Sequence, residues 1–124
     1  MRNLRLLIVE DEALVAMDLE LAASSLGVGD ILVAGSCQEA MNLIGEEWID
    51  VAILDIALPD GKSFDAAALL KARGAGIIFH SGHAEPTSLL SEFPGAEVCT
   101  KPCGPEEVMA AMQKVLHPGR TDPA

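Results

Sequence analysis

LLIVEDE, at residues 6–12, is an apolar run that ends directly in three acidic residues. A second apolar run, VAIL at residues 51–54, ends in the same way at Asp55. Continuous apolar runs are typical of parallel strands buried on both faces, and ligands of such sheets bind beyond the carboxyl ends of the strands. We therefore expect Glu10, Asp11 and Asp55 to meet at one sheet edge. Carboxylates held so close repel one another unless a cation lies between them, and Mg2+ prefers oxygen ligands of this kind.

The composition indicates one acidic domain with an aliphatic core. The chain has 124 residues, the size of a single ordinary domain; 50% are hydrophobic but only 3% are aromatic. Nineteen acidic and eight basic residues give a net charge of −11. Phosphate backbones repel such a chain, so we expect no direct binding to nucleic acid and favour partners with basic patches.

Neither a secretory signal nor a membrane span is predicted. The apolar run at residues 4–9 is too short for a signal peptide and leads straight into acids, and no stretch approaches the length of a span. The three cysteines, an odd number, fit a reducing compartment, so we expect a cytoplasmic protein. Cys99 and Cys103 are interpreted as buried small apolar side chains, because a redox or zinc role would need partners that the sequence does not show.

Short apolar runs alternate with helical patterns along the chain. Strands are predicted over Leu6–Val9, Ile31–Ala34, Val51–Leu54, Ile77–Phe79 and Glu97–Cys99. Helices are predicted over Ala13–Leu26, from Cys37, over Phe64–Arg73, weakly over Glu85–Glu92, and from Pro105 to a stop at Pro118-Gly119. This alternation predicts an α/β fold, a doubly wound five-stranded parallel sheet with helices on both faces. We expect one domain over residues 1–118 and a loose tail over residues 119–124.

The first predicted helix is apolar over an unusually wide surface. Its two stripes are Leu14, Met17 and Leu21 on one side and Val15, Leu19, Ala22 and Leu26 on the other. We expect these stripes to contact both the sheet and a neighbouring helix. Trp48, before the third strand, is expected to pack rather than to recognise a partner.

Further reactive side chains follow the later predicted strands. Ser81 comes after the fourth strand, Lys101 follows the fifth, and the carbonyl of Ala57 lies two residues beyond Asp55. A carboxylate can attack a phosphoryl group to form an acyl phosphate, and that transfer needs positive charge on the phosphoryl oxygens. Mg2+ and Lys101 would supply the charge and Ser81 a hydrogen bond. New contacts to the phosphoryl group would then draw both loops inward, as in a switch.

The chain resembles the receiver domain of two-component response regulators. The matching stretches are residues 7–12, 50–61, 78–82 and 100–102, which extend from the first strand to the last helix. The resemblance implies a flavodoxin-like (βα)5 fold with strand order 2-1-3-4-5. It also implies a phosphorylation-dependent switch that changes its affinity for a protein partner. Such a domain catalyses its own phosphorylation and dephosphorylation and is not an enzyme acting on a separate metabolite.

The resemblance assigns roles to individual residues. Asp55 would be the phosphoacceptor, with a histidine kinase or a histidine phosphotransfer protein as the donor. Glu10 and Asp11 would hold Mg2+ together with Asp55 and the backbone carbonyl of Ala57.

The same match extends to the later strand ends. Ser81 would occupy the Thr/Ser switch position, Lys101 would contact the phosphoryl group, and the Lys101–Pro102 peptide bond would be cis.

Two positions depart from the family pattern. Val98 stands three residues before the lysine, where relatives usually carry the Tyr or Phe of the aromatic switch, so the output face is expected to respond differently. Cys103 follows Pro102, where relatives usually carry Phe. Residues 79–83 partly resemble a Phe-x-Thr-Gly-Tyr pattern of single-domain receivers. Because no output domain is predicted, the chain is interpreted as a stand-alone regulator or as a piece of a longer protein, and homodimerisation is left open.

Two other functions compete with the switch. A constitutive protein-interaction module would keep the fold while its output ignored phosphorylation, and Val98 gives that alternative its weight. A flavin or nucleotide binder is disfavoured, because acids rather than a glycine-rich loop follow the first strand. His80 and His83 lack a third ligand at a suitable spacing, which favours structural roles over metal binding. A modulating effect of His83 on the acyl phosphate is a hypothesis only.

Overall fold

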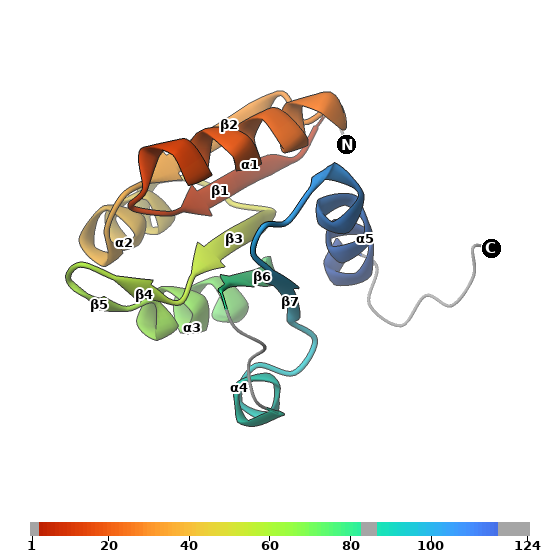
Figure 1. Cartoon of the computed structure of the whole chain (residues 1–124). Coiled ribbons are helices and arrows are strands. Elements are labelled where there is room, and N and C mark those ends of the chain that lie inside the picture. The colour runs from red at the N-terminus through yellow and green to blue at the C-terminus, as the bar shows by residue number, and fades with distance from the viewer. Residues whose placement is uncertain (1–2, 83–86, 117–124) are drawn as a thin grey trace.

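The computed structural model describes residues 3–82 and 87–116 of the chain (Figure 1). The elements follow one another as β1 (Arg5–Val9), α1 (Ala13–Ser25), β2 (Asp30–Ala34), α2 (Cys37–Glu46), β3 (Val51–Asp55), β4 (Ala57–Leu58), β5 (Gly61–Lys62), α3 (Phe64–Ala72), β6 (Gly76–Ser81), α4 (Thr87–Glu92), β7 (Glu97–Thr100) and α5 (Pro105–Leu116). The expectations for His83, for the stop at Pro118-Gly119 and for the tail concern residues outside the described part.

Five strands form one parallel sheet in the order β2-β1-β3-β6-β7. Since β6 and β7 are the fourth and fifth strands of this sheet along the chain, the expected order 2-1-3-4-5 is confirmed. The register aligns the carboxyl ends of the three strands that matter for the site. Val9 lies opposite Leu54, Asp55 lies opposite His80, and Ser81 lies opposite Thr100.

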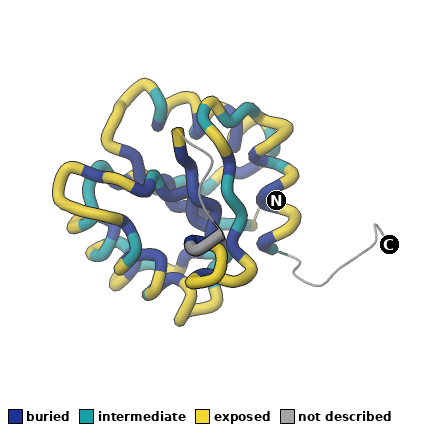
Figure 2. The backbone as a smooth tube through the Cα atoms, turned by 60° about the horizontal axis from the view of Figure 1, so that its bottom comes forward, coloured by how far each residue is buried: buried dark blue, intermediate teal, exposed yellow. Residues whose placement is uncertain are grey.

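Side chains that alternate along the strands build a core on each face of the sheet. One face packs against α1 and α5, and the other against α2, α3 and α4 (Figure 1). The strand residues of the α1/α5 face are Leu6, Ile8, Val51, Ile53, Ile78 and Cys99. Those of the opposite face are Leu7, Val9, Ala34, Ala52, Leu54, Ile77 and Phe79. Figure 2 shows the buried sheet inside a shell of helices whose outer sides are exposed. Burying a large aliphatic or aromatic side chain contributes about 1.5–3 kcal/mol, so this central sheet is the rigid base of the site.

A two-stranded hairpin, β4-β5, follows β3 and was not predicted as strands. Its turn contains the sequence Pro59-Asp60-Gly61, and Gly61 there has a φ of +137°, which favours glycine. The Asp60 carboxylate accepts hydrogen bonds from the backbone N–H groups of Cys37 (2.8 Å) and Gln38 (3.1 Å) at the start of α2. These bonds hold the pKa of Asp60 below its usual range. The segment that leaves Asp55 is thereby tied to the helix on the same face.

The expectation for the outer stripe of α1 is wrong. Leu14, Met17 and Leu21 are 76%, 53% and 66% exposed, whereas Leu19 and Ala22 of the other stripe are buried against the sheet. The expected contacts of α1 with the sheet and with a neighbouring helix, α5, are confirmed, but one stripe makes them and the other faces outward.

Trp48 also departs from the prediction, because it is 65% exposed and its indole N–H donates to Asp50.

Candidate functional site

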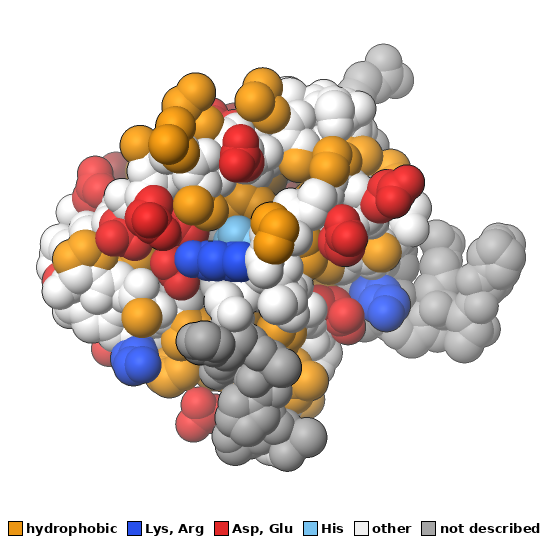
Figure 3. Space-filling view, in the orientation of Figure 1, with side chains coloured by type: hydrophobic (Ala, Val, Ile, Leu, Met, Phe, Trp, Pro, Cys, Tyr) orange, Lys and Arg blue, Asp and Glu red, His pale blue; other side chains and the backbone are white. Residues whose placement is uncertain are grey.

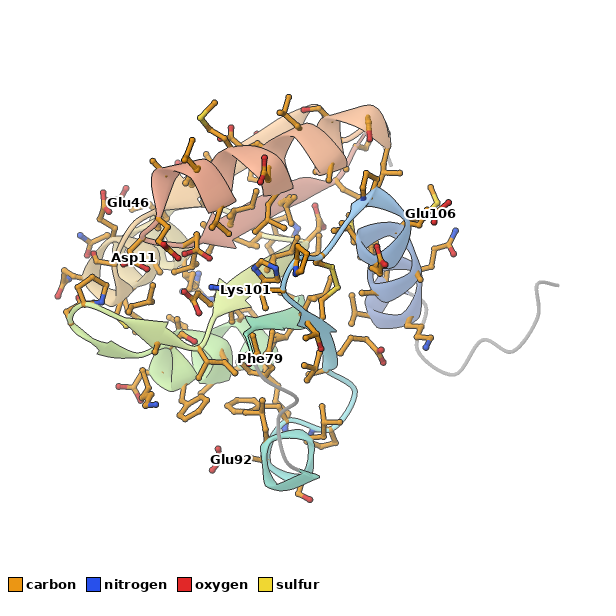
Figure 4. The ribbon with its side chains drawn as sticks, in the orientation of Figure 1. Asp11, Glu46, Phe79, Glu92, Lys101 and Glu106 are labelled. Carbon is orange, nitrogen blue, oxygen red and sulfur yellow. A yellow bond between two sulfur atoms is a disulfide. The ribbon has the colours of Figure 1, made fainter. Side chains whose placement is uncertain are left out.

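The carboxyl edge of the sheet brings the three predicted acids together. Glu10 and Asp11 follow β1, Asp55 ends β3, and one carboxylate oxygen from each lies within 4.8 Å of the others. They differ in exposure: Glu10 is buried, Asp55 is half-buried and Asp11 is exposed. Figure 4 shows Asp11 and Lys101 on this side of the molecule. Solvent therefore reaches the site at Asp11 and is excluded from it at Glu10.

Lys101 supplies the positive charge of the cluster. Its Nζ lies 3.4 Å from Oδ2 of Asp55 and 3.5 Å from Oε1 of Glu10. Burial alone would lower the pKa of Lys101, but the carboxylates of Asp55 and Glu10 outweigh it and the pKa is raised. Lys101 is therefore a stable cation at neutral pH. In the space-filling view one basic side chain lies beside a group of acidic ones, with a histidine behind it (Figure 3).

Glu10 is under electrostatic stress. Burial raises the pKa of its carboxyl and the negative charge of Asp55 adds to the effect, while the hydrogen bond from the Glu12 N–H (3.2 Å) and the charge of Lys101 oppose it. Within the described residues, the buried Oε1 atom of Glu10 accepts no hydrogen bond of normal geometry, and the Lys101 ammonium faces it at 3.5 Å. A buried carboxylate oxygen without a donor is costly. A cation beside Glu10, Asp11 and Asp55 would relieve that cost, so these residues fit the hard oxygen-ligand set of Mg2+.

A backbone hydrogen bond links Ser81 and Lys101. Ser81 is the buried last residue of β6, and its carbonyl accepts a hydrogen bond of 2.6 Å from the Lys101 N–H. The peptide bond between Lys101 and Pro102 is cis. Ala57 lies on β4, two residues beyond Asp55, and is exposed. The two predicted phosphoryl-contacting residues therefore come from neighbouring strand ends that are directly linked.

His80 lies buried in the same region, beside Glu10. The side chain is buried, and Nδ1 is 3.9 Å from Oε1 of Glu10. Burial lowers the pKa of His80 and the charge of Lys101 lowers it further, so the imidazole is neutral at pH 7. Its placement under Glu10 is set by the pairing of His80 with Asp55 across β3 and β6. The available signal in the sequence was a histidine that directly follows the apolar run Ile77–Phe79.

The cysteine prediction is corrected by the structure. Cys99 is buried, as expected, but it forms a disulfide with Cys103, which is half-buried. Cys37 is the free cysteine and is half-buried on α2. The C-x3-C spacing was the available signal, and its weakness was that spacing alone does not give the distance between Cα atoms.

Val98 lies on β7, half-buried against the core of the α2/α3/α4 face. No ring is present at this position, so the aromatic half of the family's switch has no counterpart at Val98.

These features define an α/β domain with an acidic, lysine-bearing site at the carboxyl edge of a parallel sheet. The family model described as "Response regulator receiver domain" matches residues 6–113, so the chain belongs to the family of receiver domains found in two-component systems. Receiver domains bind Mg2+ at such an acidic pocket, and the family is not generally one of enzymes with a separate substrate. No helix in the described part of the chain is long and apolar enough to cross a membrane.

Known relatives agree with this assignment. The chain is 39% identical over 115 residues to the Phyllosphere-induced regulator PhyR of Methylorubrum extorquens, covering 90% of this chain and 43% of that protein. It is 29% identical over 119 residues to the transcriptional regulatory protein YvrH of Bacillus subtilis, covering 94% and 50%. The chain thus spans about half the length of these curated relatives.

Solved structures share the fold. The PhyR receiver domain of Erythrobacter litoralis is 29% identical with a TM-score of 0.78, covering 100% of this chain and 97% of that one. A CheY-like receiver domain from Methanospirillum hungatei is 26% identical with a TM-score of 0.79, covering 91% and 93%. PhyR of Bartonella quintana, an anti-anti-sigma factor, is 27% identical with a TM-score of 0.73, covering 90% and 46%.

Proposed function

We propose that this chain is a phosphorylation-dependent switch in which Asp55 accepts a phosphoryl group and the affinity for a protein partner changes. The observation that carries the proposal is the convergence of Lys101 with Asp55 and Glu10 at 3.4 and 3.5 Å, in a cluster with Asp11. An Asp carboxylate oxygen would attack phosphorus, the bond between phosphorus and the donor's imidazole nitrogen would break, and the imidazole would leave. The donor class is the phosphohistidine of a histidine kinase or a histidine phosphotransfer protein.

Each neighbour of Asp55 has a role in that transfer. Glu10, Asp11, Asp55 and the carbonyl of Ala57 would hold Mg2+, which when bound offsets negative charge on the carboxylates and on the phosphoryl oxygens. Lys101 would shift from its pair with Asp55 to a phosphoryl oxygen, a displacement favoured because charge-assisted hydrogen bonds to phosphate are strong.

Ser81 would donate its hydroxyl hydrogen to another phosphoryl oxygen. Because the Lys101 N–H donates a hydrogen bond to the Ser81 carbonyl, the two residues would move as one unit.

The partner is expected to be a protein. The net charge of −11 disfavours nucleic-acid backbones and favours a surface with basic patches. Such a switch would work in the cytoplasm, where ATP-dependent kinases act. Because the chain spans only about half the length of its curated relatives, its output is carried either by a separate partner or by further sequence. A pull-down that compares wild type with Asp55→Asn would identify a separate partner.

The test is phosphoryl uptake by the full chain. Incubation with acetyl phosphate and Mg2+ is expected to add one phosphoryl group, seen by intact mass, which is absent in Asp55→Asn and with EDTA. Asp18→Asn, an exposed acid on α1, is the matched control and keeps the adduct. No adduct from acetyl phosphate, phosphoramidate or a phosphorylated histidine phosphotransfer protein would instead support the constitutive interaction module, the alternative that Val98 suggests.

A further inference from the structure

The Cys99–Cys103 disulfide closes a ring of residues that includes Lys101. The two Cα atoms are 5.9 Å apart, within the normal range for a disulfide. Only Thr100, Lys101 and Pro102 lie between them, so the bond closes a small ring around the residue that contacts Asp55. Figure 4 shows the bond between the two sulfur atoms beside Lys101, between β7 and α5.

We propose that Cys99 and Cys103 are a redox-active pair whose oxidation state sets how firmly Lys101 is held beside Asp55 and Glu10. The pair is a modification site outside the acidic cluster, and the effect on phosphorylation rests on the proposed function. In the disulfide form, the three-residue link carrying Lys101 is fixed at both ends by one covalent bond. In the dithiol form this covalent restraint is lost while the hydrogen bond from the Lys101 N–H to the Ser81 carbonyl remains, and the lysine samples more positions.

The pair is unequally exposed, which determines how a reductant reaches it. Cys99 is 6% exposed, whereas Cys103 is half-buried. Cys103 lines a cavity of about 870 Å³ between α1 and the segment that joins β7 to α5, with Leu21, Ala22 and Pro102 also in its wall. A small dithiol or hydrogen peroxide can enter a cavity of that size, so the reaction starts at the sulfur of Cys103.

The chemistry balances as a two-electron exchange. A thiolate of a dithiol reductant attacks Sγ of Cys103, and the Cys99–Cys103 bond breaks with its electron pair on Sγ of Cys99, which takes a proton. The second thiol of the reductant then attacks its own bound sulfur and releases Cys103 as a thiol, leaving the reductant as a disulfide. In the reverse direction, hydrogen peroxide converts Cys103 to a sulfenic acid, and Cys99 displaces water from it to restore the bond.

A structural staple is a poor explanation of this bond. The stabilisation expected from a disulfide grows with the logarithm of the loop that it closes, and this ring spans a sequence separation of four. The backbone on either side of the ring is already held in place without the disulfide. Cys99 pairs with His80 in the sheet, and the N–H of Val108 donates a hydrogen bond to the carbonyl of Gly104 at the start of α5. In the reducing compartment that the proposed function requires, disulfides are usually transient or redox-sensing.

The first test measures the pair itself and does not depend on phosphorylation. The full chain is equilibrated in dithiol redox buffers, free thiols are alkylated, and the intact mass is read. One alkylation, at Cys37, is expected under oxidising conditions and three under reducing conditions, with full recovery after hydrogen peroxide. Cys37→Ser is the matched control, and both its counts are expected to be lower by one. A pair that stays fully oxidised or fully reduced across the buffers would overturn the proposal.

The second test measures coupling to the site. Asp55 ends β3 and Glu10 follows β1, away from the disulfide ring, so their side-chain carboxylate 13C resonances report on Lys101 in the Mg2+-free protein. Reduction is expected to shift both resonances and to slow phosphoryl uptake from acetyl phosphate by about tenfold, since misplacing a reacting group by an ångström can cost up to about a hundredfold. Cys103→Ser is expected to match the reduced wild type under both conditions.

The outcomes separate the two proposals. Unshifted carboxylate resonances with a reversible thiol count would overturn the coupling to Lys101. Shifted resonances with no phosphoryl adduct in either redox state would support the coupling and refute the proposed function.

Discussion

Replacing Lys101 with methionine is expected to destabilise the Mg2+-free protein by about 2 kcal/mol at pH 7. The variant keeps most of the aliphatic stem and removes the charge, so the acids at the sheet edge lose their only cation within the described residues. At an effective dielectric constant of about 20, opposite charges at the 3.4 Å separating Nζ from Asp55 attract by roughly 5 kcal/mol. The Lys101 side chain is 24% exposed, and its removal from water offsets much of that attraction. The net value then falls between exposed pairs, up to about 1 kcal/mol, and buried pairs, about 3–5 kcal/mol.

The pH dependence of this loss has a defined sign. The pKa of Lys101 is raised despite burial, by Asp55 and Glu10, so its contribution is fully present below the ordinary value of 10.5 and is lost as the pH rises through the higher folded value. The loss in the variant also shrinks at acidic pH, because protonated carboxyls no longer need a cation. The difference between wild type and variant is therefore expected to be largest between these limits.

Urea unfolding in EDTA at pH 7 measures the effect. Lys114→Met is the matched control, because Lys114 forms a single pair with Glu97 at 3.8 Å and its side chain is 68% exposed, so a loss below about 1 kcal/mol is expected. Mg2+ is expected to restore more stability to Lys101→Met than to wild type, since it meets no competing ammonium at the same oxygens. Equal losses for the two lysine variants, or equal rescue by Mg2+, would refute the reasoning about the acidic cluster.

Three further outcomes are expected. Glu10→Gln raises the stability of the Mg2+-free protein. Because the pKa of Glu10 is raised in the folded state, wild type loses stability as the pH rises above the ordinary value of 4.5. The stability advantage of the variant in urea titrations is therefore larger at pH 7.5 than at pH 5. Gly76→Ala costs about 1–3 kcal/mol, because its Cβ would lie 2.7 Å from Cγ2 of Val115; Gly29→Ala, with open space around it, is the control, and equal melting temperatures would contradict the packing argument. Asp60→Ala speeds amide exchange at the start of α2, where the Asp60 carboxylate accepts backbone hydrogen bonds. Because these hydrogen bonds lower the pKa of Asp60, the difference in exchange from wild type vanishes as the pH falls below 3.8 through the folded value. A difference that does not change with pH would count against this role of Asp60.

The parts that were predictable are those that depend on strand ends. Residues 6–9 and 51–54 are uninterrupted apolar runs, so they could be placed as strands buried on both faces, and the acids after them then had to share an edge. Lys101 was located by the same argument, since its strand is short but ends in the same direction. In a parallel sheet the direction of the chain fixes which end carries the loops, and a residue's place in the sequence is then enough.

The features that were missed depend on what lies opposite a residue. The outer stripe of α1 is as apolar as the inner one, and no local pattern tells which will find a partner. The β4-β5 hairpin has two residues in each strand, too few for a period of two to be visible. The cysteine pair could not be predicted because the C-x3-C spacing leaves the Cα distance free, and that distance decides whether a bond can form.

The absence of an aromatic ring at residue 98 changes how a signal could leave the site. Lys101 is held on one side by Asp55 and Glu10 and on the other by a covalent ring that ends at Cys103, two residues before α5 begins. In the proposed disulfide form, a displacement of Lys101 would act on both β7 and the segment that leads into α5. A side chain that swings between buried and exposed positions is not needed for that transfer. Val98 and Cys103 both depart from the family pattern, and under the proposal the disulfide would supply a link between the site and α5 in place of the aromatic switch.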